Sequence, residues 1–122
     1  MKIIEGRMTL VTLPLLRKKT VEVNIEDIVY IESSDSICFL IKQFNNTVEK
    51  IPINCTLTEI EDIVNSTEFY KIHRSLIVNL KYVVDYGEYP TSTIHLKASL
   101  GNLPLSKRRR LHFHNAYKAL RN

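Results

Sequence analysis

Hydrophobic and polar residues alternate along several short stretches of the chain. In residues 19–25, KTVEVNI, the side chains of Val21, Val23 and Ile25 would share one face, with polar side chains on the other. This alternation is typical of a half-buried β-strand. The same reasoning predicts strands at residues 27–33, 37–44 and 47–53.

Turn residues separate the predicted strands. Asn45-Asn46 tolerates positive φ and therefore predicts a hairpin turn between the last two strands. Pro52 lacks a backbone N–H, which places it at a strand end or on a sheet edge. KYVVDY and STIHLK predict a second hairpin across residues 87–90, and residues 101–102 separate it from LPLS. Short strands with turns at close intervals indicate a mainly β protein of antiparallel sheets.

Two segments have the hydrophobic period of helices. In residues 55–66, CTLTEIEDIVNS, Thr58 and Glu61 fit a capping box. In residues 105–122, LSKRRRLHFHNAYKALRN, Ser106 would cap a C-terminal helix. The expected apolar faces are Leu57, Ile60, Ile63 and Val64 in the first helix, and Phe113, Ala116, Tyr117 and Leu120 in the second.

The predicted C-terminal helix begins with four consecutive cations, Lys107 to Arg110. Positive charge at a helix N-terminus opposes the helix dipole, so stability alone would favour acidic residues there. A bound phosphate would satisfy both the cations and the exposed N–H groups. The pattern therefore indicates an anion-binding element.

Composition restricts the class of protein. With 122 residues, 44% hydrophobic and 25% charged, the chain predicts one domain, residues 1–122, in which residues 1–7 could be an N-terminal extension. No apolar run approaches the ~20 residues of a membrane span, and no signal-peptide cleavage site follows the N-terminus. Two cysteines are too few for a disulfide scaffold, so we expect a cytoplasmic protein without membrane insertion.

Charge is distributed unevenly along the chain. Residues 1–70 hold 7 basic and 11 acidic side chains, whereas residues 71–122 hold 10 basic and 2 acidic ones. A basic half of this kind indicates a polyanionic partner such as nucleic acid or an anionic membrane surface. A lysine-rich solvated surface explains the charge equally well.

The sequence does not have the motifs of common active sites. His112 and His114 are two positions apart and would point to different sides of a helix, and no zinc-binding spacing is present. There is no glycine-rich phosphate loop and no nucleophile elbow, and Ser75 near His73 has no evident third member of a triad. We therefore expect no metal, no cofactor and no enzymatic activity.

The segment FYKIHRSLIVNLKYV, residues 69–83, is mostly apolar but carries an arginine at its centre. A buried arginine is costly unless it is paired. Arg74 should therefore either pair with a carboxylate, such as Glu32 or Glu68, or be exposed for a function.

Four ordered motifs resemble those of the LytTR DNA-binding domain. They are DIVYIES at 27–33, TLTEIEDIV at 56–64, FYKIHRSLIVNLKYV at 69–83 and LPLSKRRR at 103–110. The resemblance runs from about residue 8 to residue 120. It implies an elongated arrangement of small antiparallel sheets with one or two short helices, in a bacterial transcription regulator.

The resemblance also implies the mode of binding. Loops of the family enter successive major grooves of double-stranded DNA at paired promoter direct repeats, so a second copy of the chain would bind beside the first. Most members follow a receiver domain, which this chain lacks, so the chain is expected to be either a stand-alone regulator or a part of a longer protein. A stand-alone regulator would then be controlled by its abundance, by redox or by a regulatory partner protein.

Three loops carry the implied base contacts. The first follows YIES and contains Ser36 and Cys38, where many members have histidine, asparagine or tyrosine; we favour Ser36 as the donor. The second has Arg74 and the third Arg108, and arginine is the side chain best suited to bidentate bonds with guanine. The implied backbone contacts are His73, Asn79, Lys81, Ser106, Lys107 and Arg109.

Two alternatives remain open. Asn79 is expected to hold a turn in place more than to contact DNA. The runner-up function is a protein-interaction module whose basic half binds an acidic partner.

Overall fold

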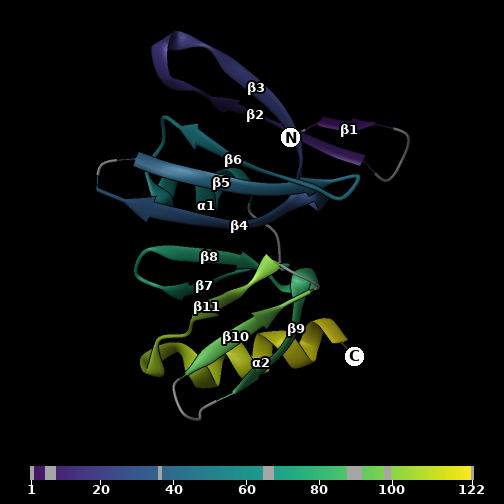
Figure 1. The fold of residues 1–122 in the computed structure, drawn as a ribbon, viewed down its shortest axis with the longest axis vertical. Helices are drawn as coiled ribbons and strands as arrows, with labels where there is room; N and C mark the ends of the chain where they lie inside the picture. Colours follow the sequence, from purple (N-terminus) through teal and green to yellow (C-terminus); the bar gives the residue numbers. More distant parts are fainter. Residues whose placement is uncertain are drawn as a thin grey trace. The chain divides into compact units, whose positions relative to one another are not determined.

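The computed structural model describes residues 2–4, 8–35, 37–64, 68–87, 92–97 and 100–121. The chain forms two compact units, Met1–Asn65 and Ser66–Asn122. Most described residues lie in short antiparallel strands, with one α-helix in each unit (Figure 1). The mainly β prediction is confirmed.

The first sheet of the N-terminal unit has the strand order β1-β2-β3. Its strands are β1 (Lys2–Ile4), β2 (Met8–Pro14) and β3 (Thr20–Asn24). The sequence predicted only β3, where Val23 is buried and Glu22 exposed. Residues 2–4, which belong to the segment that could be an N-terminal extension, pair with residues 8–10 as an edge strand. A turn with left-handed residues, η1 (Leu16–Lys18), follows β2, and a single-turn 3₁₀ helix, η2 (Ile25–Asp27), follows β3.

A meander of three antiparallel strands follows in the same unit. It consists of β4 (Ile28–Ser34), β5 (Ile37–Phe44) and β6 (Thr47–Ile53), so the three predicted strands are confirmed. Asn45 and Asn46 form the predicted turn with φ of 50° and 64°. Pro52 is one residue from the end of β6. Leu40 and Ile31 are fully buried and place the core under β4 and β5.

Helix α1 (Leu57–Val64) begins two residues earlier than the predicted capping box implies. Glu59 N–H donates to Thr56 Oγ1 at 3.1 Å, and Thr56 N–H donates to Glu59 Oε1 at 2.9 Å. These bonds lower the pKa of Glu59. The assignment to Thr58 and Glu61 was wrong, because the pattern T-x-x-E occurs twice and only the first copy leaves Leu57 inside the helix and buried.

The position of this cap predicts a contrast between two threonines. Thr56→Ala should lower the free energy of unfolding by about 1 kcal/mol, because it removes an N-cap acceptor. Thr58→Ala, at an exposed position within the helix, should change it by less than about 0.5 kcal/mol. Urea unfolding of both variants measures the difference. Equal effects would contradict the assignment of Thr56 as the cap.

The C-terminal unit contains a hairpin and a three-stranded sheet. The hairpin pairs β7 (Phe69–His73) with β8 (Leu76–Asn79). After a 3₁₀ turn, η3 (Leu80–Tyr82), the sheet has the order β11-β10-β9. Its strands are β9 (Val83–Gly87), β10 (Thr93–Leu96) and β11 (Asn102–Pro104), which confirms the predicted pairing of KYVVDY with STIHLK. Gly101, with φ of 98°, turns the chain into β11.

Helix α2 (Arg110–Arg121) follows a 3₁₀ turn, η5 (Lys107–Arg109). Ser106 occupies the N-cap position of η5, but its side chain makes no capping hydrogen bond. Its carbonyl instead accepts from Arg109 N–H at 3.0 Å, so the predicted side-chain cap is wrong. The tighter 3₁₀ turn uses this main-chain bond to start the helix.

Aromatic side chains hold α2 in the C-terminal unit. Phe113 is fully buried and meets the rings of Tyr70 in β7 and Tyr86 in β9 edge-on, with centroids 5.9 and 5.1 Å away. Tyr117 stacks on Phe113, and its hydroxyl donates to the Val84 carbonyl at 2.9 Å. These contacts fix the helix, and with it the cations at its start, relative to the hairpin. In the part of the chain described, no helix is long and apolar enough to cross a membrane.

Candidate nucleic-acid interface

Arg74 is at the turn of the β7–β8 hairpin and is exposed. Lys71 pairs with Ile77, and His73 pairs with the adjacent Leu76, so Ile72 is an extra residue in β7 and forms a β-bulge. Ile72 and Ile77 are both fully buried and anchor the turn from below. The apolar residues of this segment therefore belong to the core, and the arginine projects from the turn.

The carboxylates considered as partners of Arg74 form ion pairs with lysines. In the N-terminal unit, Glu32 Oε1 lies 2.9 Å from Lys50 Nζ. In the C-terminal unit, Glu68 Oε1 lies 3.3 Å from Lys81 Nζ. The exposure of Arg74 agrees with the functional interpretation of this residue.

His73 and Ser75 stiffen the turn on either side of Arg74. Ser75 N–H donates to His73 Nδ1 at 3.3 Å, and the Ser75 hydroxyl lies 3.1 Å from the same nitrogen. When Nδ1 accepts these bonds, the ring hydrogen of a neutral histidine is on Nε2. His73 can then donate outward to an anion.

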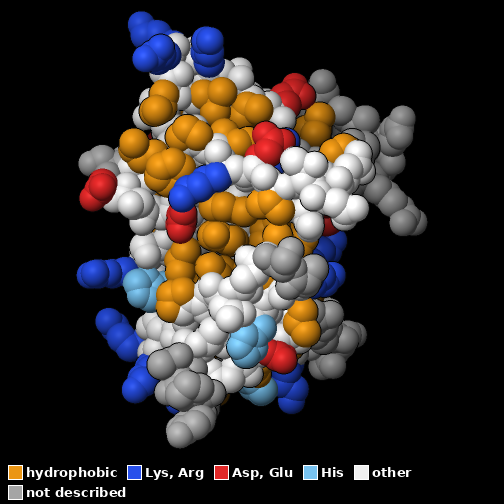
Figure 2. Space-filling view, in the orientation of Figure 1, with side chains coloured by type: hydrophobic (Ala, Val, Ile, Leu, Met, Phe, Trp, Pro, Cys, Tyr) orange, Lys and Arg blue, Asp and Glu red, His pale blue; other side chains and the backbone are white. Residues whose placement is uncertain are grey.

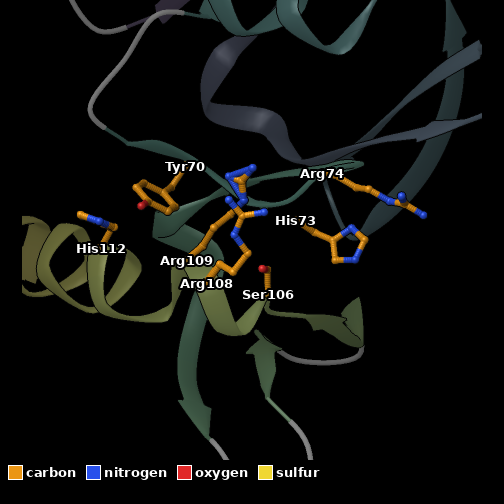
Figure 3. A pocket seen from close by; sticks show the side chains of 7 residues that line it. All are labelled: Tyr70, His73, Arg74, Ser106, Arg108, Arg109 and His112. Atoms are coloured by element: carbon orange, nitrogen blue, oxygen red, sulfur yellow. The ribbon is translucent and has the colours of Figure 1, made fainter.

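One main-chain hydrogen bond joins the start of η5 to the hairpin. Ser106 N–H donates to the Ile72 carbonyl at 2.8 Å. Beside this bond is an open hollow of about 370 Å³ (Figure 3). Its lining residues are Tyr70, His73, Arg74, Ser106, Arg108, Arg109 and His112. The structure thus brings together two loops that are more than 30 positions apart in the sequence.

The hollow is suited to an anion. Figure 3 shows the guanidinium groups of Arg108 and Arg109 next to one another, with Arg74 extending away from them. Among the described residues, none of those that line the hollow is acidic. Burial raises the pKa of Tyr70, and the positive charge of Arg109 opposes that rise. Clustered guanidinium groups without carboxylates attract phosphate, which would relieve their mutual repulsion.

A second hollow, of about 440 Å³, also borders η5. It is lined by Tyr86, Lys107, Arg108, Arg110, Leu111 and His114. Tyr86 and His114 hydrogen-bond to each other. Arg108 borders both hollows, whereas Lys107 borders only this one. The predicted contact residues 106–109 therefore do not all face one site.

Asn79 is fully buried at the end of β8. Its Oδ1 accepts from Lys81 N–H at 3.0 Å, which caps η3. The structural interpretation of Asn79 is confirmed, and burial removes this side chain from the contacts we propose to DNA. Lys81 itself is 42% exposed and lies beside Glu68.

The turn between β4 and β5 is in the N-terminal unit. Cys38 is only 2% exposed, since it shares the inner face of β5 with Leu40. Burial raises the pKa of its thiol. A base contact by this side chain is inconsistent with its burial, so we withdraw Cys38 from the expected contacts. Ser36, the other expected donor of this loop, lies outside the described residues.

Among the described residues, no group of three or more His, Cys, Asp or Glu could hold a metal ion. Cys38 and Cys55 are both free, and burial raises the pKa of each thiol.

The sequence did not lead us to predict two of the residues that line the hollow, Tyr70 and His112. Tyr70 precedes the bulge and meets α2 through Phe113. His112 is three positions after Arg109, so both lie on one side of the helix start. That helical spacing was a usable signal, whereas the position of Tyr70 depends on tertiary packing.

Comparisons with known proteins show which family this sequence and fold match. A family model described as the LytTr DNA-binding domain matches residues 18–118. The chain is also similar to the solved LytTr DNA-binding domain of a putative methyl-accepting/DNA response regulator from Bacillus cereus. The two share 22% sequence identity and a TM-score of 0.65, over 88% of this chain and 95% of that one. A search of curated proteins gives no match. The match to the family model covers well over half of the chain, which therefore belongs to the LytTR family of DNA-binding domains.

Proposed function

We propose that this domain binds double-stranded DNA sequence-specifically at promoter direct repeats and so regulates transcription in the bacterial cytoplasm. The observation that carries the proposal is the exposed Arg74 at the β7–β8 turn, which lines the same hollow as Arg108 and Arg109. Two copies would lie in the same direction on the two repeats. Loops, and not a recognition helix, would enter successive major grooves.

The proposed contacts divide by chemistry. Arg74 and Arg108 would bond to base edges, because a planar guanidinium matches the two acceptors of guanine. Ser36 is proposed as a third base contact. The backbone phosphates would be bound by His73, Lys81, Ser106, Lys107 and Arg109, which are half-buried or exposed and donate hydrogen bonds. Phosphate contacts would fix the register, and base contacts would choose the sequence.

Salt dependence tests the phosphate contacts. The logarithm of the affinity for duplex should fall linearly with the logarithm of salt concentration, with a slope of about −0.9 per phosphate bound. Lys107→Ala should make this slope less steep by about one unit and weaken all duplexes alike. Lys81→Ala should behave in the same way. Fluorescence anisotropy over a salt series measures both quantities.

Lys118→Ala is a suitable control, because Lys118 is exposed on α2 and lines neither hollow. It should leave the slope close to that of the wild type. Affinity that does not depend on salt, or no binding to duplex below physiological salt, would refute the proposal.

A further inference from the structure

The turn between β2 and β3 carries three consecutive cations that none of the contacts above uses. Arg17, Lys18 and Lys19 follow Leu16, and all four side chains are exposed. Figure 2, drawn in the orientation of Figure 1, shows Lys and Arg side chains gathered over this turn with no acidic side chain among them on that face. Residues 1–65 hold 7 basic and 10 acidic side chains. An acidic unit therefore concentrates three of its seven cations at one turn.

The backbone of this turn is unusual for the residues in it. Leu15 N–H donates to the Lys19 carbonyl at 2.7 Å and closes the loop. Inside it, Arg17 and Lys18 have φ of 63° and 61°, the left-handed region that glycine and asparagine tolerate best. A turn selected for stability alone would favour those residues. Long cationic side chains at both positions indicate that charge is needed there.

The base of this turn lies at the same end of the N-terminal unit as the β4–β5 turn. Asn54 N–H donates to the Pro14 carbonyl at 2.8 Å, and the preceding Ile53 pairs with Cys38. Cys38 in turn pairs with Ser33, next to the β4–β5 turn. Paired strands lie about 4.8 Å apart, so the two steps between paired strands from Ile53 to Ser33 span roughly 10 Å, and the hydrogen bond from Asn54 joins them to the base of the β2–β3 turn. Figure 1 shows both turns on the same side of this unit.

This spacing is close to the width of a groove. The major groove of DNA is about 12 Å wide, with a phosphate backbone on each side. A duplex whose groove received the β4–β5 turn would have one backbone within reach of side chains as long as arginine and lysine. Such side chains bind phosphate through charge and do not read bases.

We infer that the β2–β3 turn, residues 16–19, binds the sugar-phosphate backbone of the same duplex, beside the groove entered by the β4–β5 turn. The inference rests on the proposed function and adds a contact in the acidic unit of the domain. Leu16 and Arg17 precede the residues matched by the family model, 18–118. The contact would strengthen binding to every sequence equally.

A double variant removes two of the three positive charges without straining the turn. Arg17→Asn combined with Lys18→Asn removes two cations and places at both positions the non-glycine residue that best tolerates positive φ. The matched control is Lys97→Asn combined with Lys118→Asn, which removes two exposed cations from the other unit. Affinity of the full chain for its preferred duplex and for a random duplex is measured by anisotropy over a salt series.

The turn variant should lose about 1.8 units of salt slope, which corresponds to roughly 30-fold weaker binding at about 0.15 M salt. The loss should be the same on both duplexes, and the control should remain near the wild type. Hydroxyl-radical footprinting should show a stretch of backbone that the wild type protects and the turn variant leaves exposed. Arg17→Lys, which keeps the charge, should retain the affinity.

Three outcomes would overturn the inference. A turn variant with the salt slope, affinity and footprint of the wild type would overturn the inference. The proposed function would still stand if Arg74→Ala lost discrimination between the two duplexes. A loss confined to the preferred duplex would mean that the turn reads bases. A wild-type chain that binds no duplex would refute the inference and the proposed function together.

Discussion

Arg74→Ala should abolish much of the domain's discrimination between its preferred duplex and random DNA. We expect a loss of about 1–3 kcal/mol on the preferred duplex, the typical value of one bidentate arginine–guanine contact, and a much smaller loss on random duplex. Arg74→Lys should fail to restore it, because an ammonium keeps the charge but lacks the planar fork. Anisotropy titrations of both variants on both duplexes measure the effect.

The thermal stability of the same variants distinguishes a role of Arg74 in base contacts from a role in supporting the structure. Arg74 is exposed at its turn, and the buried Ile72 and Ile77 stabilise the hairpin without it. Both variants should therefore unfold close to the wild-type temperature. A large fall in the thermal midpoint with unchanged discrimination would show that Arg74 supports the structure and does not read bases.

Phe113→Ala should have the largest effect on stability. Phe113 is fully buried between Tyr70 and Tyr86, and removing a buried aromatic ring costs about 3–5 kcal/mol. Since a domain of this size has a total stability of about 5–15 kcal/mol, much of it should be lost. Because the ring also holds α2 against β7, binding to every duplex should weaken in the protein that still folds.

Leu111→Ala is the control on the same helix, since Leu111 is 68% exposed. It should change the free energy of unfolding by less than about 0.5 kcal/mol. Urea unfolding compares the two variants, with attention to whether the slope of the transition stays constant. A change for Phe113→Ala no greater than for Leu111→Ala would contradict its role as the anchor of the helix.

Local patterns predicted the strands well where alternation and turn chemistry agreed. The predicted bounds of β5 and β6 match the structure, since Asn45-Asn46 fixes the turn between them. The strands β1 and β2 were missed, because residues 2–14 have no clear alternation and β2 depends on pairing with β3. The start of α1 was misplaced because two overlapping copies of one capping pattern compete.

The candidate site was only partly predictable from the sequence. The exposure of Arg74 follows from the high cost of burying an arginine. The burial of Cys38 was also accessible, since it is two residues from the core residue Leu40 on one strand. The hollow itself depends on the Ser106–Ile72 hydrogen bond and on the packing of Phe113 against Tyr70, which are tertiary contacts that no local pattern encodes.

Selection of bound duplexes from a randomised pool tests the central claim, sequence-specific binding, most directly. The wild-type chain should enrich a motif present in two copies, in the same orientation, on each selected duplex. Arg74→Ala should enrich a weaker motif that has lost its preference at one base position. A wild-type pool that stays random after several rounds, in a protein that is folded and retains the duplexes, would contradict sequence-specific binding.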